Sequence, residues 1–181
     1  ASGVIPQISA VFGTCGGGMA VSSALADFTF MEEKKGRLFV NSPNAIDDNY
    51  TGKCDTASAE YQSSMAGNVD FTGTEEEILG QIRTLVTILP ANNEDDLSYD
   101  ECSDDLNRVC EDLANCVEDT GLALSAVSDN HFYMEVQKDY APSMVTAFIR
   151  LNGTTVGCVA NRCAVYGENG EKTAEYAPVL D

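Results

Sequence analysis

A glycine-rich turn between an apolar run and a small-residue segment constrains this chain more than any other feature. Residues 11–20 read VFGTCGGGMA; a mostly apolar run, 4–12, leads into them, and AVSSALA follows at 20–26. This order predicts a strand, a glycine turn and the first turns of a helix. Glycine suits the turn because it adopts positive φ and has no Cβ to keep a ligand from the backbone. The unpaired amides that open a helix can hold a phosphate or an oxyanion.

Two common glycine motifs are excluded. No Gly-Lys-Ser or Gly-Lys-Thr follows the turn, so it is not a P-loop, and the glycine spacing is not that of a dinucleotide fingerprint. A glycine triplet alone is more typical of a plain tight turn. The flanking residues are therefore the ones that point to a function.

Those flanking residues resemble one protein family. The segments are SGVIPQIS at 2–9, GTCGGG at 13–18 and SALADFTFM at 23–31. They are similar to the patterns S-G-V-I-P-Q, G-P-C-A-G-G and S-P-A-L-x-D-F of the carboxyltransferase component of biotin-dependent acyl-CoA carboxylases and decarboxylases. Thr14, Gly16 and Ser23 depart from the family, which has proline, alanine and proline there. The glycine pair of the family is kept as Gly17 and Gly18.

A second group of segments resembles the start of the second half of the same family. FYMEV at 132–136, YA at 140–141 and TAFIRLNGTTVGCVAN at 146–161 are similar to F-F-E followed by G-F-x-R-L-N-G-x-x-V-G-x-V-A-N. The resemblance implies an α/β fold of the crotonase type, a spiral of ββα turns with helices packed outside. The resemblance does not include the opening of the family's first half or the remainder of its second half, so we expect the sequence to be part of a longer subunit.

The resemblance and the composition together predict three segments. Residues 1–91 are the latter part of the N-terminal half, 92–127 an acidic linker and an amphipathic helix, and 128–181 the beginning of the C-terminal half. The acidic run NNEDD at 92–96 is the predicted internal boundary.

In the first segment, strands are predicted at 27–31 and 37–40, separated by a charged turn. Residues 41–44 break the second strand and are suited to capping a helical turn, and 44–73 read as a loop-rich excursion with short helices. Thr74 opens a capping box with Glu77. Apolar residues then recur at helical spacing until Pro90, which predicts a core-facing helix: Ile78, Ile82, Leu85, Val86 and Leu89.

Beyond the acidic run, a second amphipathic helix is predicted from one apolar stripe, made of Leu106, Val109, Cys110, Leu113, Cys116 and Val117. Asn152-Gly153 between the apolar runs 144–151 and 154–161 predicts a β-hairpin. We expect its second strand to be buried on both faces near the middle. From Ala164 the chain is polar, and no closing element is predicted.

The net charge and the cysteine content limit the partners and the metal sites that this chain can have. The 29 acidic and 10 basic residues give a net charge of −19 and a pI near 4.1, which disfavours nucleic acid and anionic lipid as partners. The chain also offers no basic patch for the phosphates of coenzyme A. It has seven cysteines and no C-x-x-C pair, so we predict no metal site and reduced thiols, mostly buried, in a cytoplasmic protein.

The remaining candidate side chains favour structural roles. His131 has no sequence partner that would orient it as a base, so we expect a solvated or capping histidine. Cys110 and Cys116 are expected in the core. In the family, the segment corresponding to 66–70 usually carries a histidine, and Asn68 is nearest to that place.

The resemblance implies transfer of a carboxyl group between carboxybiotin and an acyl-CoA thioester, with the biotin on a separate carrier domain. Backbone amides hold the developing oxyanions; in this chain the candidates are Gly17 and Gly18, with Gly16 and Met19 binding substrate beside them. The implied partners are the biotin carboxyl carrier domain, a biotin carboxylase or a membrane decarboxylase subunit, and further copies of the chain. No direct membrane insertion is expected.

Two alternatives remain open. One is another crotonase-class enzyme, such as an enoyl-CoA hydratase or isomerase, which would need a carboxylate pair that the sequence does not offer outside solvated charge runs. The other is a non-catalytic piece that folds and oligomerises. We expect this chain to be inactive by itself.

Overall fold

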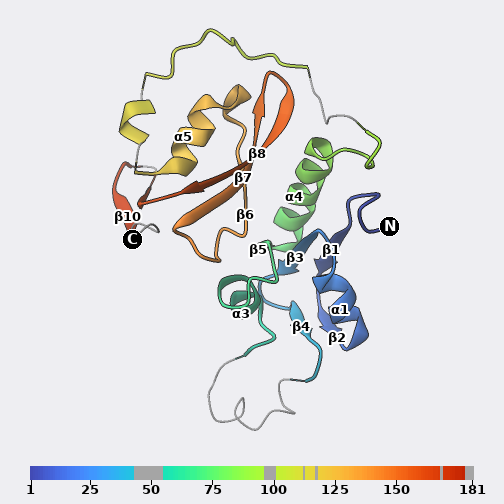
Figure 1. Ribbon diagram of the computed structural model, residues 1–181. Coiled ribbons are helices and arrows are strands. Elements are labelled where there is room, and N and C mark those ends of the chain that lie inside the picture. The colour runs from blue at the N-terminus through green and yellow to red at the C-terminus, as the bar shows by residue number, and fades with distance from the viewer. Residues whose placement is uncertain (43–54, 96–100, 112, 117, 168, 178–181) are drawn as a thin grey trace. The chain divides into compact units, whose positions relative to one another are not determined.

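The computed structural model describes residues 1–42, 55–95, 101–111, 113–116, 118–167 and 169–177. The chain divides into two compact units, Ala1–Asp96 and Leu97–Asp181 (Figure 1). The division follows directly after the acidic run 92–96. Each unit is described by itself.

The first unit is built on a parallel sheet in the order β1-β3-β5, formed by β1 (Ile8–Val11), β3 (Phe28–Glu32) and β5 (Phe71–Gly73). A second parallel pair joins β2 (Thr14–Gly16) to β4 (Arg37–Phe39). These strands confirm the predictions at 27–31 and 37–40 to within a residue at each end. Parallel strands need crossover connections, and α1 (Gly18–Ala24) provides the one between β1 and β3.

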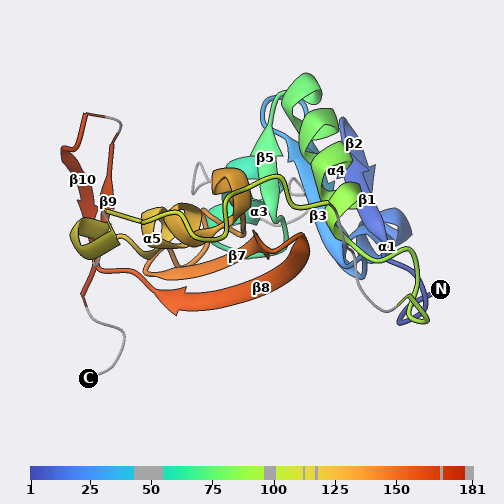
Figure 2. The same cartoon turned by 90° about the horizontal axis from the view of Figure 1, so that it is seen from above.

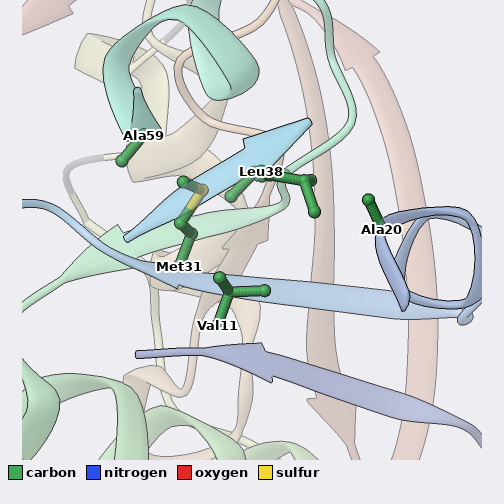
Figure 3. Close-up of a cluster of buried hydrophobic side chains, with 6 residues drawn as sticks. Val11, Ala20, Met31, Leu38 and Ala59 are labelled. Atoms are coloured by element: carbon green, nitrogen blue, oxygen red, sulfur yellow. The ribbon is translucent and has the colours of Figure 1, made fainter. Parts of the chain in front are cut away.

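Side chains of β3 alternate between the two faces of this sheet, so both faces build core. On one face, the Phe30 and Phe71 rings stack with centroids 4.5 Å apart, and the helix α4 packs against β3 and β5. On the other face Met31 belongs to a buried cluster with Val11, Ala20, Leu38, Ala59 and Val69. Five of these side chains point toward one another in Figure 3.

The helix α4 (Glu75–Ile88) begins as predicted. Thr74 Oγ1 accepts from the Glu77 amide at 3.3 Å, and the Glu77 carboxylate accepts from the Thr74 amide at 2.8 Å, which completes the capping box. Ile78 and Leu85 are fully buried, but Val86 is 58% exposed and Ile88 takes its place in the core. The predicted stripe was wrong at Val86. On a helix, Ile88, three residues after Leu85, lies on the same face as Leu85, whereas the adjacent Val86 does not.

The excursion before β5 contains the short helix α3 (Ala59–Ser64), which Ser58 caps. This confirms a loop-rich segment with a short helix for its described part, 55–73. The prediction that 41–44 cap a helical turn falls largely on 43–54, outside the described residues.

The second unit is built on an antiparallel sheet in the order β6-β7-β8, from β6 (Met134–Val136), β7 (Met144–Leu151) and β8 (Thr154–Asn161). Asn152 and Gly153 connect the long strands with φ of 52° and 78°, so the predicted hairpin is confirmed, with the left-handed turn that Asn-Gly favours. The helix α5 (Thr120–Val127) packs against β7 and lies along one face of the sheet (Figure 2). The short 3₁₀ helix η3 (Asp129–His131) follows it.

The predicted amphipathic helix over 106–117 was wrong. Its described part has one short 3₁₀ helix, η2 (Leu113–Cys116), and Leu106 and Val109 are 61% and 79% exposed. The Arg108 guanidinium donates instead to the carbonyls of Ala126 and Ser128, at 2.8 and 2.7 Å, which ties the segment to the end of α5. Cys110 and Cys116 are partly exposed rather than core residues. The helix of this region, α5, lies further along the chain.

Two expectations for the end of the chain were also wrong. β8 is not buried on both faces, because Gly157, Val159 and Asn161 are exposed, Val159 to 74%. Their register with β7 places them on the sheet face opposite the buried Val145, Ala147 and Ile149. The polar segment after 163 does form a closing element, the antiparallel pair β9 (Ala164–Tyr166) and β10 (Lys172–Glu175). The amides of Cys163 and Ala164 both donate to the Glu118 carbonyl, at 2.9 Å, which fixes the start of the pair.

Candidate active site at the glycine turn

The glycine turn joins the end of β2 to the start of α1. Gly17 is the residue before the helix, with φ 63° and ψ −136°, a conformation that side chains other than glycine's rarely adopt. Its amide donates to the Phe39 carbonyl at 3.0 Å, extending the pairing of β2 with β4. Gly17 therefore reverses the chain, and its own N–H is already used.

The next two amides are open. Gly18 and Met19 are the first residues of α1, both are exposed, and neither amide has a hydrogen-bond partner among the described residues. The following amides of Ala20 and Val21 donate to the Gly17 carbonyl, at 3.1 and 3.4 Å. Two adjacent N–H groups thus face outward at the positive end of the helix.

Gly16 lies against an aromatic ring. A Cβ on this residue would stand 2.9 Å from the Phe39 ring, so an alanine, the family's residue here, would require the ring to shift. The absence of a Cβ at Gly16 lets β4 approach the turn closely. This is a packing role, and it keeps Phe39 in register to accept from Gly17.

A hollow of about 370 Å³ lies beside the turn, between β1 and α1. Its lining comes from the edge strand, the residues after it and the inner side of the helix: Gln7, Ile8, Ser9, Ala10, Val11, Phe12, Gly13, Thr14, Cys15, Met19, Ser22, Ser23 and Ala26. Met19 is the one predicted site residue that lines it. Gly16, Gly17 and Gly18 stand outside the lining.

Ser23 holds the helix to the sheet below the hollow. Its hydroxyl lies 2.6 Å from that of Ser9, and its carbonyl accepts from the Thr29 hydroxyl at 3.0 Å. Ser23 is 5% exposed. The serine that replaces the family's proline therefore adds a partly buried hydrogen bond between β1 and α1.

The side chains around the turn offer little acid–base chemistry. Among the described residues, no three His, Cys, Asp or Glu side chains are grouped to hold a metal ion. Asn68 is exposed and donates to Gln62 at 3.0 Å, and His131 lies in the other unit, exposed, with Nδ1 3.3 Å from the Ser125 carbonyl. What the turn can do is stabilise a negative oxygen with backbone donors. In the described part of the chain no helix has the length and apolarity needed to cross a bilayer.

Comparison with known proteins supports the family predicted above. Residues 1–177 match the family model described as the carboxyl transferase domain. The chain belongs to the carboxyltransferase family. It is 38% identical to the propionyl-CoA carboxylase carboxyltransferase subunit of Haloferax mediterranei, over the whole of this chain and 38% of that protein. It is 33% identical to the methylmalonyl-CoA decarboxylase subunit alpha of Propionigenium modestum, over 99% of this chain and 38% of that protein. The chain thus spans well under half the length of these relatives.

Solved structures agree with the fold. A crystal structure of the transcarboxylase 12S subunit, described as a hexamer with hydrolysed methylmalonyl-coenzyme A bound, superposes with a TM-score of 0.79 at 32% identity, covering 89% of this chain and 34% of that one. A single-chain, multi-domain long-chain acyl-CoA carboxylase gives 0.61 at 18% identity, covering 87% of this chain and 16% of that one, a likeness of fold alone. The predicted crotonase-like α/β fold is confirmed.

The sequence predicts the glycine turn, but it does not predict that the Gly17 amide donates to the Phe39 carbonyl. The strand pairing that engages Gly17 depends on β4, about twenty residues further along the chain. The sequence predicts 13–18 as a turn, whereas in the structure Thr14–Gly16 form the strand β2, and its pairing with β4 continues to Gly17.

Proposed function

We propose that this chain is part of the carboxyltransferase component of a biotin-dependent acyl-CoA carboxylase or decarboxylase, which transfers a carboxyl group between carboxybiotin and an acyl-CoA. The observation that carries the proposal is the family match over 1–177, together with a glycine turn that presents two open amides. Biotin on its carrier would supply the carboxyl group, and the acyl-CoA thioester is the other substrate.

In this proposal the Gly18 and Met19 amides hold a developing oxyanion, that of the biotin ureido group or that of the acyl enolate. The positive φ of Gly17 sets the direction of these two amides. The Gly17 amide could donate to the oxyanion only if its hydrogen bond to the Phe39 carbonyl were broken. The donor pair of this proposal lies one residue further along the chain than the pair that the sequence predicts, Gly17 and Gly18. Met19 also lines the hollow, where it would contact substrate, and Gly16 seats the turn on Phe39.

The ion pairs of three basic side chains in this unit suggest that coenzyme A is bound by this chain together with other parts of the assembly. Lys34, Lys35 and Arg37 each lie 3.2–3.3 Å from a carboxylate, of Glu33, Glu75 and Asp55 respectively. Their charges are balanced within the unit, which leaves little attraction for the coenzyme's phosphates. We infer that other parts of the assembly contribute to binding them.

The proposed partners are a biotin carboxyl carrier domain, a biotin carboxylase or a membrane decarboxylase subunit, and further copies of the chain. A relative named as a decarboxylase subunit and a structural neighbour described as a hexamer support these assignments. The described cysteines are free thiols, in keeping with a cytoplasmic protein.

A pair of substitutions at Gly18 tests the oxyanion role. Gly18→Pro removes the amide hydrogen at the first position of a helix, where proline is tolerated; Gly18→Ala keeps it, and its Cβ would have open space. Carboxyl transfer is measured in a full-length version of the protein with a biotinylated carrier and propionyl-CoA. We expect the alanine variant to stay near wild type and the proline variant to lose roughly 10²–10³-fold in kcat.

Equal activity in the two variants, with the fold checked by circular dichroism, would exclude the Gly18 amide as a donor. Hydration of an enoyl-CoA without biotin would instead favour the hydratase alternative and overturn the carboxyltransferase proposal. Carboxylation by this chain alone would contradict the expectation that it is inactive by itself.

A further inference from the structure

We propose that the two Asn-Gly turns of the second unit differ as sites of spontaneous deamidation: Asn169-Gly170 is open to modification, and the Asp129 carboxylate protects Asn152-Gly153. These are the two Asn-Gly pairs of the chain. The proposal concerns a modification site and does not depend on the carboxyltransferase activity.

Deamidation at Asn-Gly needs the glycine nitrogen as a nucleophile. This nitrogen gives up its proton and bonds to the side-chain carbonyl carbon of the asparagine, while the bond from that carbon to the amide nitrogen breaks and ammonia leaves. Water then opens the cyclic imide to aspartate or isoaspartate. Anything that keeps the proton on the glycine nitrogen, or holds that nitrogen in place, slows the first step.

Asp129 acts on this nitrogen directly. Its Oδ2 accepts from the Gly153 amide at 2.7 Å, and its Oδ1 accepts from the Asn152 amide at 3.1 Å. Asp129 is 7% exposed and Gly153 is buried. A carboxylate at hydrogen-bond distance stabilises the N–H form and opposes the negative charge that deprotonation would create. Burial of the glycine also restricts the access of hydroxide to its amide.

The Asp129 carboxylate, bound to the amides of Asn152 and Gly153, forms a clamp on the turn. Hydrogen bonds of the preceding residue hold this clamp in place. Ser128, with no exposed surface, accepts from the Arg150 amide at 3.0 Å and donates to the Arg150 carbonyl at 3.2 Å. These bonds attach the residue before Asp129 to the end of β7, one residue from the strand's last position. The carboxylate therefore has little freedom to leave the turn.

The second pair lacks this protection. Asn169 and Gly170 are both exposed at the turn between β9 and β10. The Gly170 amide donates to the neutral carbonyl of Gly167 at 2.9 Å, and Gly170 has φ of 76°. A single bond to a neutral acceptor in an exposed turn is weaker than a charge-assisted bond in a buried one. Modification here would add one carboxylate, taking the formal net charge from −19 to −20.

The test is peptide mapping by mass spectrometry after incubation of the whole protein at mildly alkaline pH. We expect Asn169 to be converted and Asn152 to react slower by a factor of roughly ten or more, the factor that a charge-assisted hydrogen bond would give. In urea, where the clamp is lost, the two rates should become similar. Comparable rates in the folded protein would overturn the proposal.

Asp129→Asn is the matched variant, because it keeps the shape of the side chain and removes its charge. We expect faster conversion of Asn152 and an unchanged rate at Asn169, which acts as the internal standard. Hydrogen exchange of β7 and β8 peptides reports whether the variant stays folded. If the variant is folded and Asn152 reacts at the wild-type rate, Asp129 is not the protecting group. If the variant is unfolded, the comparison of folded and urea-unfolded wild-type protein decides the question by itself.

Discussion

The two units bury different chemistry. Nearly all of the largest fully buried side chains belong to the first unit: Phe30, Met31, Val69, Ile78, Leu85 and Ile88. In the second unit Val145 and Ser128 are the corresponding residues, and charged side chains are buried beside them: Asp119, Asp129 and Arg162. Among the described residues, the first unit buries mostly apolar side chains and one charged side chain, Glu32, whereas the second unit buries fewer apolar side chains and more charged ones.

Sheet architecture explains the difference. The parallel sheet of the first unit buries residues on both faces, as parallel sheets generally do. In the described part of the second unit, the antiparallel sheet packs against α5 through β7 and gathers fewer buried apolar side chains. Its loops are fixed by bidentate contacts instead: Asp129 holds the hairpin turn, and Asp119 accepts from the Gly121 and Tyr166 amides at 3.1 and 3.0 Å.

A further group of polar contacts surrounds Arg162. Its guanidinium lies 2.9 Å from Glu135 Oε1 and donates to the Pro142 carbonyl at 3.0 Å, with both charged side chains nearly buried. Tyr133 donates to the other oxygen of Glu135 at 2.8 Å. Burial, followed by this hydrogen bond to a carboxylate, raises the pKa of the Tyr133 phenol. The phenol therefore remains a donor throughout the physiological range.

The largest expected effect comes from breaking that pair. Glu135→Ala leaves the Arg162 charge buried without its partner, so we expect a loss of about 3–5 kcal/mol in the free energy of unfolding. Urea unfolding measures the loss, and hydrogen exchange should place it in the second unit. The double variant Glu135→Leu with Arg162→Met is the control, because removing both charges should restore much of the stability. A loss below about 1 kcal/mol would show that the pair acts like a surface salt bridge.

A core truncation in the first unit should come next. Leu85→Ala removes a fully buried side chain of α4 and should cost about 2–5 kcal/mol. The adjacent Val86, 58% exposed, is the matched position: Val86→Ala should stay within about 0.5 kcal/mol. Loss of amide protection in β3 and β5 peptides is expected for the first variant only. Equal losses in the two variants would contradict the assignment of Leu85 to the core.

The cap of α4 gives a smaller effect in the same unit. Thr74→Ala removes the hydroxyl of the capping box and should lower the stability by roughly 0.5–2 kcal/mol. Thr84 on the same helix, whose hydroxyl donates to the Gly80 carbonyl at 3.1 Å, is the control, and Thr84→Ala should change the stability much less. If the two threonine variants melt at the same temperature, the capping box contributes nothing measurable.

The smallest expected effect is a dependence on pH. The Thr74 amide, then the Thr74 hydroxyl, lowers the pKa of Glu77 from its ordinary 4.5. Because the folded-state pKa is the lower one, this contribution is present above pH 4.5 and is lost as the pH falls through the folded-state value. Glu77→Gln should flatten the acid side of a plot of Tm against pH. A slope identical to wild type would exclude Glu77 as a contributor.

The features that the sequence alone determined are those in which neighbouring residues supply both partners. Thr74 and Glu77 satisfy each other's amides within one helical turn, and Asn152-Gly153 has the backbone preference that its hairpin requires. Gly17 likewise adopts positive φ in a turn that the neighbouring glycines already predict. Local geometry decides such features. The fold class and the function of the glycine turn were predicted instead from the resemblance of the segments 2–31 and 132–161 to the carboxyltransferase family.

Tertiary structure decided the rest. An apolar stripe predicted a helix over 106–117, but Arg108 reaches carbonyls about twenty residues away and holds the segment against α5. The exposed face of β8 depends on which side of the sheet a helix covers. At the glycine turn, the Phe39 carbonyl engages the Gly17 amide and leaves those of Gly18 and Met19 open. Hydrogen bonds between distant segments form only when the chain has folded, so no local pattern encodes which donors stay free.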